Sequence, residues 1–206
     1  MNKQKQVGIL LYEYVDILDF SGPAEVLSLA AINKLQQSVN LYKKKMLANN
    51  PFRVFTVSET GEQIKTHTGI KVEPEFSFVN APKIDILIIP GGPLRAVEEI
   101  SKNERIINWI MEHSQVDYLC SVCTGAFILA RTGVLNGKKA ATHHLASNIL
   151  KRKYPSIQVA SEKVIQDENV ITCGGVSSGI NMALYLVEQV LGSEAAERTA
   201  KTIEFT

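Results

Sequence analysis

Short apolar runs alternate with longer amphipathic segments along most of the chain. Val7–Tyr12 and Ile84–Ile89 are apolar at almost every position, which is typical of parallel strands buried on both faces. In Arg105–His113, by contrast, the apolar side chains recur at helical spacing. Alternation of the two patterns predicts an α/β protein with a doubly wound, mostly parallel sheet and helices on both faces.

The patterns also predict most of the elements by residue range. The other expected strands are Phe52–Val57, Val116–Val122, Val164–Ile165 and Val170–Thr172, and Gln63–Val72 alternates like a small hairpin. The expected helices are one with Pro23 in its first turn, then Arg105–His113, Ala126–Ala130, Ile180–Leu191 and Glu194–Ile203. No repeat, linker or low-complexity tract interrupts them, so we expect a single domain over residues 1–206.

Composition and charge indicate which kinds of binding partner the protein is not expected to have. Hydrophobic residues make up 45% of the 206 residues and charged residues 21%, which is typical of a soluble globular protein. With 22 Lys and Arg against 21 Asp and Glu, no net field favours nucleic acid or a membrane surface, and the row Lys43–Lys45 is interpreted as solvated. The first residues lack the apolar core of an export signal, so we expect a cytoplasmic location with free thiols.

Cys123 is the strongest candidate for chemistry. An apolar strand leads directly into Cys123-Thr124-Gly125 and then into an apolar helix. A side chain on such a turn is held above the sheet edge, where the amides at the helix N-terminus favour a thiolate. We therefore predict a nucleophilic Cys123 with a lowered pKa, whereas Cys120, inside the strand, is interpreted as a structural thiol.

A glycine turn follows the strand that ends at Ile89. Gly91 and Gly92 have no side chains to cover their amides, and turns at the carboxyl ends of parallel strands meet at one edge of the sheet. Together with the amide of Thr124, these amides are expected to bind charge that develops on a substrate atom.

Asp19 is a second candidate for chemistry. It lies between Leu18 and Phe20, shortly after the first strand and just before Ser-Gly-Pro. A partly buried carboxyl beside a nucleophile can hold a proton or orient a water molecule. Asp also favours the N-cap of a helix, and this stretch alone leaves both roles open.

Together, these stretches resemble the ThiJ/PfpI superfamily. The resemblance rests on IPGG (residues 89–92), the Cys123 turn and Thr142-His143, and it covers the chain from Val7 to about Leu191. The stretches LDFSGP (18–23), SVCTG (121–125), LNGKKAATH (135–143) and GGVSSGI (174–180) look most similar to isocyanide hydratases. They also resemble the domains that precede the DNA-binding modules of AraC-type regulators. The resemblance implies a flavodoxin-like, class I glutamine amidotransferase-like fold.

The resemblance also implies roles for individual residues. Cys123 becomes the nucleophile, Asp19 the acid/base carboxylate, and Gly92 and Thr124 backbone donors. An isocyanide hydratase would hydrate an isocyanide to an N-formamide through a thioimidate on Cys123. The alternatives are a ligand or redox sensor without catalysis and a glyoxalase- or deglycase-like enzyme. Peptidases and many glyoxalase-like members carry His where this chain has Thr124, and the latter use Glu where it has Asp19.

The remaining expectations concern cofactors and partners. We expect a small-molecule substrate, no cofactor and no membrane or nucleic-acid partner, because a chain ending at Thr206 leaves no room for a DNA-binding module. No two His or Cys residues show zinc spacing, so no metal is predicted, and His143 and His144 are given no catalytic role. Relatives are usually homodimers, and we expect a homodimer here.

Overall fold

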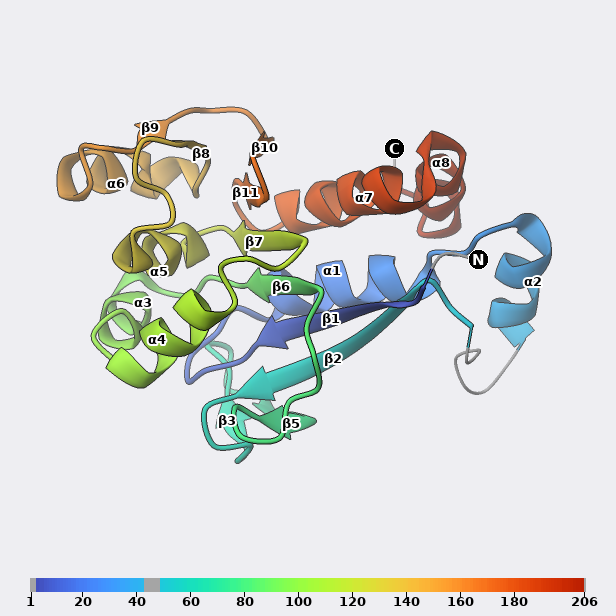
Figure 1. Cartoon of the computed structure of the whole chain (residues 1–206), viewed down its shortest axis with the longest axis horizontal. Helices are drawn as coiled ribbons and strands as arrows, with labels where there is room; N and C mark the ends of the chain where they lie inside the picture. The colour runs from blue at the N-terminus through green and yellow to red at the C-terminus, as the bar shows by residue number, and fades with distance from the viewer. Residues whose placement is uncertain (1–2, 43–48, 206) are drawn as a thin grey trace.

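A seven-stranded sheet runs through the middle of the protein (Figure 1). The computed structural model describes residues 3–42 and 49–205, so the predicted solvated row Lys43–Lys45 lies outside the described residues. Neighbouring strands are parallel except for β10, which is antiparallel to β11. In spatial order the strands are β10 (Val164–Asp167), β11 (Val170–Cys173), β7 (Tyr118–Val122), β6 (Ile86–Ile89), β1 (Lys5–Leu10), β2 (Phe52–Ser58) and β5 (Phe76–Ser77).

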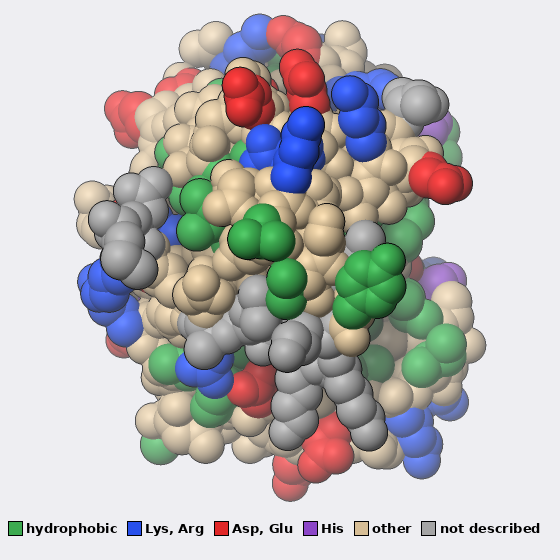
Figure 2. Space-filling view, turned by 90° about the vertical axis from the view of Figure 1, so that its right-hand side faces the viewer, with side chains coloured by type: hydrophobic (Ala, Val, Ile, Leu, Met, Phe, Trp, Pro, Cys, Tyr) green, Lys and Arg blue, Asp and Glu red, His purple; other side chains and the backbone are tan. Residues whose placement is uncertain are grey.

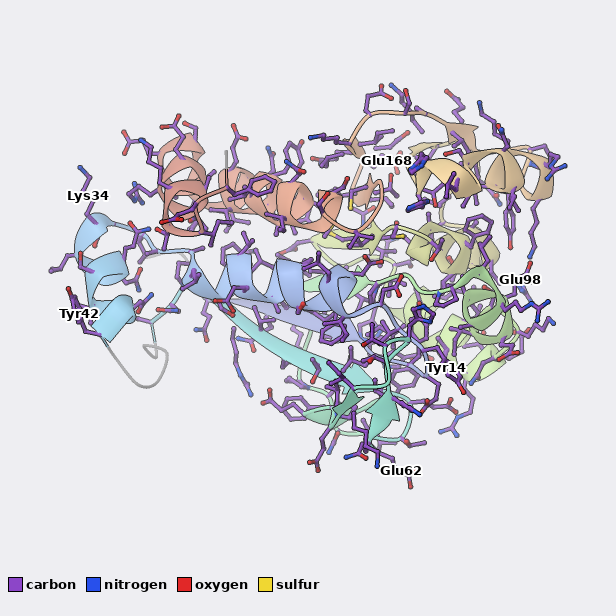
Figure 3. The ribbon with its side chains drawn as sticks, turned by 180° about the vertical axis from the view of Figure 1, so that it is seen from behind. Tyr14, Lys34, Tyr42, Glu62, Glu98 and Glu168 are labelled. Atoms are coloured by element: carbon purple, nitrogen blue, oxygen red, sulfur yellow. The ribbon has the colours of Figure 1, made fainter. Side chains whose placement is uncertain are left out.

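Helices cover both faces of this sheet, which confirms the predicted doubly wound α/β class (Figures 1 and 3). One face carries α1 (Ile17–Leu29), α7 (Ser178–Leu191) and α8 (Ser193–Thr202), which pack on one another. The other face carries α3 (Leu94–Ile100), α4 (Glu104–Glu112) and α5 (Gly125–Thr132). The central strands are covered from both sides, and every residue of β6 is fully buried.

Shorter elements surround this frame. The predicted hairpin is present as β3 (Ile64–Lys65) and β4 (Lys71–Val72), which pair antiparallel. A second small sheet pairs β8 (Lys139–Ala140) with β9 (Gln158–Val159), next to η1 (His144–Ala146) and α6 (Ser147–Lys153). The helix α2 (Lys34–Tyr42) lies at the end of the molecule near both termini, far from the carboxyl ends of the central strands (Figure 1).

The predicted start of the first helix is wrong. The sequence placed Pro23 in the first turn, but α1 begins at Ile17 and Pro23 lies in its interior. Proline there removes the amide that would bond to the carbonyl of Asp19. The helix continues because its packing against α7 stabilises it: a side chain on Gly179 of α7 would come within 3.3 Å of the Pro23 ring. Asp19 therefore lies in the first helical turn and is not the N-cap residue, which is Asp16.

The surface shows no strong segregation of charge at the end that carries α2. Figure 2 faces this end and shows acidic and basic side chains interspersed with scattered hydrophobic ones. Two of the exposed hydrophobic side chains belong to α2, namely Leu35 and Tyr42. Among the described residues, no helix is long and apolar enough to cross a membrane. The structure is of a single chain, and the homodimer stays a prediction.

Candidate active site

Three turns meet beyond the carboxyl ends of adjacent strands. The strands β7, β6 and β1 lie side by side in this order. Beyond their carboxyl ends lie the turn with Cys123, the turn with Gly91 and the first turn of α1 with Asp19. The chain runs from β1 to β2 on one side and returns to β6 on the other, so this is a topological switch point, where open α/β sheets bind ligands. Figure 3 labels Tyr14, from the loop after β1, at this end of the sheet, with Lys34 and Tyr42 of α2 at the opposite end.

Cys123 occupies the strained turn that its sequence context predicted. Its φ is 58°, in the left-handed region that costs a non-glycine residue about 1–3 kcal/mol. Gly125 permits the turn because a Cβ there would lie 2.3 Å from the Ile89 carbonyl oxygen. The Cys123 amide donates to the Gly174 carbonyl, and the Thr142 hydroxyl donates to the Cys123 carbonyl, 2.8 Å away. The surrounding backbone thus holds the cysteine in its strained conformation.

The glycine turn lies directly against the cysteine turn, as predicted. The Gly92 amide donates to the Thr124 hydroxyl oxygen at 2.9 Å, and this hydroxyl donates back to the Gly92 carbonyl at 2.7 Å. The Gly91 amide donates to Oδ2 of Asp19 at 3.0 Å. A Cβ on Gly91 would lie 2.5 Å from the Thr124 hydroxyl and 2.9 Å from that carboxylate oxygen, so only glycine fits between them.

The two glycine amides hold neighbouring side chains in place, a role that the sequence did not suggest. Both donate within the protein, to Asp19 and to Thr124, so in this structure neither is an unoccupied donor. The amides that act on the Cys123 sulfur, by lowering its pKa, are those of Thr124 and Val176. A substrate-binding role of Gly91, Gly92 and Thr124 stays a prediction.

Asp19 is buried beside the thiol, and a second carboxylate, Asp16, joins the pair. One carboxylate oxygen from each Asp and the Cys123 sulfur all lie within 4.8 Å of one another. The Asp19 side chain is fully buried, and Oδ1 receives no hydrogen bond from a nitrogen or oxygen donor of the described residues. Burial and, to a smaller extent, the Asp16 charge raise the pKa of Asp19 to about 7, against the opposing effect of the Gly91 hydrogen bond.

The prediction of a lowered thiol pKa is wrong for a thiol that faces an ionised Asp19. Burial, followed by the Asp19 charge, raises the pKa of Cys123 to about 12, although the amides of Thr124 and Val176 act in the opposite direction. The sequence suggested the helix amides but not the burial, and only 3% of Cys123 is exposed. Because each negative charge disfavours the other, Asp19 and Cys123 titrate as a pair that keeps one proton above neutral pH.

Several residues at the site were missed by the sequence analysis. Tyr12 is buried just after β1, and its hydroxyl donates to the Pro90 carbonyl at 2.9 Å, which helps to hold the glycine turn in place. Burial raises the pKa of Tyr12 well above its usual value, so it stays a neutral donor. Val176 follows β11 and supplies an amide to the sulfur. The only available sequence signal was the second glycine pair, Gly174-Gly175.

His143 and His144 lie beside the site. Their rings stack with centroids 4.5 Å apart, and a Cβ on Gly175 would lie 2.5 Å from the His143 ring. The Leu145 amide donates to Nδ1 of His143, which leaves the other ring nitrogen of a neutral His143 protonated. Burial and His144 lower the pKa of His143, whereas Asp16 raises it. His143 is therefore close enough to Asp16 to affect its charge.

The chemistry of this cluster also suits a metal ion. A thiolate and two carboxylates within 4.8 Å of one another could serve as three ligands, from residues with no metal-binding spacing along the chain. One oxygen of Asp19 is already held by the Gly91 amide, and the thiol and Asp19 share a proton that a metal would displace. The predicted absence of a metal stays a prediction.

The buried carboxyl makes stability depend on pH. Asp19 has a pKa of about 7 in the folded chain and about 3.9 when unfolded, so its contribution is complete below pH 4 and lost as the pH rises through 7. We expect the free energy of unfolding to fall by about 3 kcal/mol between pH 5 and pH 8 on account of this group. Asp19→Asn should remove this part of the slope in urea denaturation, whereas Glu25→Gln, an exposed residue of the same helix, should keep it. Equal slopes in all three proteins would contradict the assignment.

The chain matches proteins of one family along most of its length. The family model for DJ-1/PfpI matches residues 5–189. Isonitrile hydratase from Pseudomonas putida is 29% identical over 203 residues, which cover 97% of this chain and 78% of that protein. The HTH-type transcriptional regulator GbdR from Pseudomonas aeruginosa is 23% identical over 190 residues, which cover 92% of this chain and 48% of the regulator.

A solved structure gives the same result for the fold. A ThiJ/PfpI family protein from Pseudomonas syringae superimposes with a TM-score of 0.82 at 21% identity, covering 98% of this chain and 76% of that one. At this identity the likeness concerns the fold alone. With the match over residues 5–189, the chain belongs to the DJ-1/PfpI family.

Proposed function

We propose that this protein hydrates a small organic isocyanide to an N-formamide, with Cys123 as nucleophile and Asp19 as proton donor. The observation that carries the proposal is the pairing of a strained, amide-bonded cysteine with a buried carboxyl whose pKa is about 7. A carboxyl of this pKa is about half protonated at neutral pH, so it can both give up and take back a proton during a reaction. The 29% identity to isonitrile hydratase supports the choice of reaction.

The reactive form carries the shared proton on Asp19. The sulfur is then a thiolate, and the amides of Thr124, at the start of α5, and Val176, after β11, stabilise its charge. Asp19 is neutral in this form, so its burial costs little, and Gly91 keeps its Oδ2 in place. This form and the form with the proton on Cys123 each carry one negative charge, and the nearby amides stabilise that charge when it lies on the sulfur.

The reaction divides into two steps. The thiolate forms a C–S bond to the terminal carbon of the isocyanide, and Asp19 transfers its proton to that carbon, which gives a thioimidate on Cys123. Water then adds to the same carbon, the C–S bond breaks, and the N-formamide leaves with the thiolate restored. Covalent catalysis of this kind replaces one difficult addition by two easier ones.

Incubation of the protein with an alkyl isocyanide tests the proposal. We expect the proton NMR spectrum to show an N-formamide that accumulates in proportion to the protein concentration. The matched control is the protein after alkylation of its thiols in urea, which retains the chain but not the site. If the native protein produces no more formamide than the alkylated one, the proposal is wrong.

A sensor without catalysis is the second candidate. It is favoured by the similarity to GbdR, because the chain spans about half the length of that regulator and aligns over 92% of its own. In that case a small ligand would bind at Cys123 and change stability without being converted. A shift in the unfolding temperature by a ligand that is recovered unchanged would support the sensor.

A further inference from the structure

Asp16 is an acidic residue at the site for which the reaction scheme above has no task. It is the N-cap residue of α1, yet its side chain makes no capping hydrogen bond. Its carboxylate lies instead within 4.8 Å of both the Cys123 sulfur and a carboxylate oxygen of Asp19. An N-cap Asp ordinarily accepts a bond from the first helical turn, so this side chain is directed away from its usual local partner and towards the thiol.

The backbone fixes Asp16 in this place. Its amide donates to the Gly91 carbonyl at 2.9 Å, which ties it to the glycine turn that holds Asp19. The preceding carbonyl, of Val15, accepts from the amide of His67 in the β3–β4 hairpin, and the Tyr14 amide donates to Lys65 of the same hairpin. Hydrogen bonds to the glycine turn and to the hairpin therefore hold the backbone around Asp16 in place.

The environments of the two carboxylates differ in ways that suit different roles. Asp19 is fully buried, whereas Asp16 is half-buried and reached by solvent. Burial raises the pKa of Asp16 as well, but His67 and His143 act against this shift. Two carboxylates in one site that differ in burial and in neighbouring charges can serve as an acid and a base.

We propose that Asp16 is the general base that activates water in the second step, while Asp19 is the acid of the first. This inference rests on the proposed isocyanide hydration. A carboxylate oxygen of Asp16 lies within 4.8 Å of the sulfur, close enough to reach, through one water molecule, the carbon that becomes bound to that sulfur. Asp19 has no such access to solvent, since its side chain is fully buried behind the thiol and Gly91.

With these roles, every proton is accounted for over one catalytic cycle. At the start, Cys123 is a thiolate, Asp19 is protonated and Asp16 is ionised. After the thioimidate has formed, Asp19 is ionised. Asp16 takes one proton from the attacking water and passes it to the substrate nitrogen. When the C–S bond breaks, the remaining hydroxyl proton goes to Asp19, the sulfur leaves as a thiolate, and all three groups return to their initial forms.

The test compares turnover with covalent labelling in Asp16→Asn and Asp19→Asn. In Asp16→Asn we expect formamide production to fall about 10²- to 10⁴-fold, the usual contribution of a general base. The thioimidate should still form, so intact-protein mass spectrometry should show Cys123 carrying the mass of one isocyanide. In Asp19→Asn the adduct itself should form slowly, because the first proton transfer is lost.

Glu13→Gln is the matched control, because it removes an exposed carboxylate from the same loop. It should keep wild-type turnover and show no adduct, and Asp16→Glu should recover part of the activity lost in Asp16→Asn. Turnover of Asp16→Asn within twofold of the wild type would overturn the assignment, as would slow turnover without an accumulated adduct. If the wild type forms neither formamide nor adduct, the hydration itself is wrong, and Asp16 has no such role.

Discussion

Replacing Cys123 by Ala should lower N-formamide production at least about 10⁴-fold, to the rate without protein. No other thiol can take over, because Cys120 and Cys173 are fully buried within strands β7 and β11. Burial raises the pKa of both these thiols, as it does for Cys123, but neither belongs to the cluster that Cys123 forms with Asp16 and Asp19. Removing the nucleophile of an enzyme that works through a covalent intermediate typically removes nearly all of the rate enhancement.

The matched control is Cys120→Ala, three residues earlier in the same strand. It removes one buried sulfur from the core and should keep turnover within a few-fold of the wild type. The measurement is the initial rate of formamide appearance at equal concentrations of folded protein, checked by circular dichroism. Equal rates in Cys123→Ala and the wild type would show that the thiol takes no part in the reaction.

Gly125→Ala should be the most destabilising single-methyl addition at the site. The added Cβ would lie 2.3 Å from the Ile89 carbonyl oxygen and 2.9 Å from that of Pro90. Both are backbone atoms of a fully buried strand and its turn, so neither can move aside as a flexible side chain would. We expect a loss of about 3 kcal/mol in the free energy of unfolding, at the upper end of the range for overpacked cores.

The same substitution should also lower turnover, since it forces the cysteine turn away from the turn that holds Asp19. A displacement of about 1 Å between reacting groups can cost about 100-fold in rate. Gly22→Ala is the matched control: it adds a methyl group to another helical glycine, where the nearest atom belongs to the Ile180 side chain at 3.3 Å. Urea denaturation and initial rates should separate the two variants, and equal stability would contradict the predicted clash.

The sheet could be predicted because its central strands are apolar on both faces. The predicted strands Ile84–Ile89 and Val116–Val122 end at the same residues as β6 and β7, and begin two residues early. Of the two ends of a strand, the carboxyl end is the more important one to predict, because the turns that follow it form the site. The start of α1 was wrong because Pro23 suggested a first turn, whereas packing against α7 lets the helix begin at Ile17.

The site was predicted in part. Cys123 and Asp19 lie together because they follow the carboxyl ends of β7 and β1, which flank β6, and the sequence pattern is enough to predict this. The pattern cannot show burial, so the expected direction of the thiol pKa was wrong. Asp16 was missed for a related reason: its side chain lacks the capping bond expected of its place in the sequence, and only the folded backbone reveals where it lies instead.

The slight exposure of Cys123 has a consequence for substrate choice. Only 3% of Cys123 is exposed, and its surroundings are backbone turns held by hydrogen bonds on several sides. A molecule that reaches the sulfur without moving these turns must be slender at its reacting end, as a rod-shaped terminal carbon is. Branching next to the reacting group should therefore impair reaction far more than a longer tail, which extends outward into solvent.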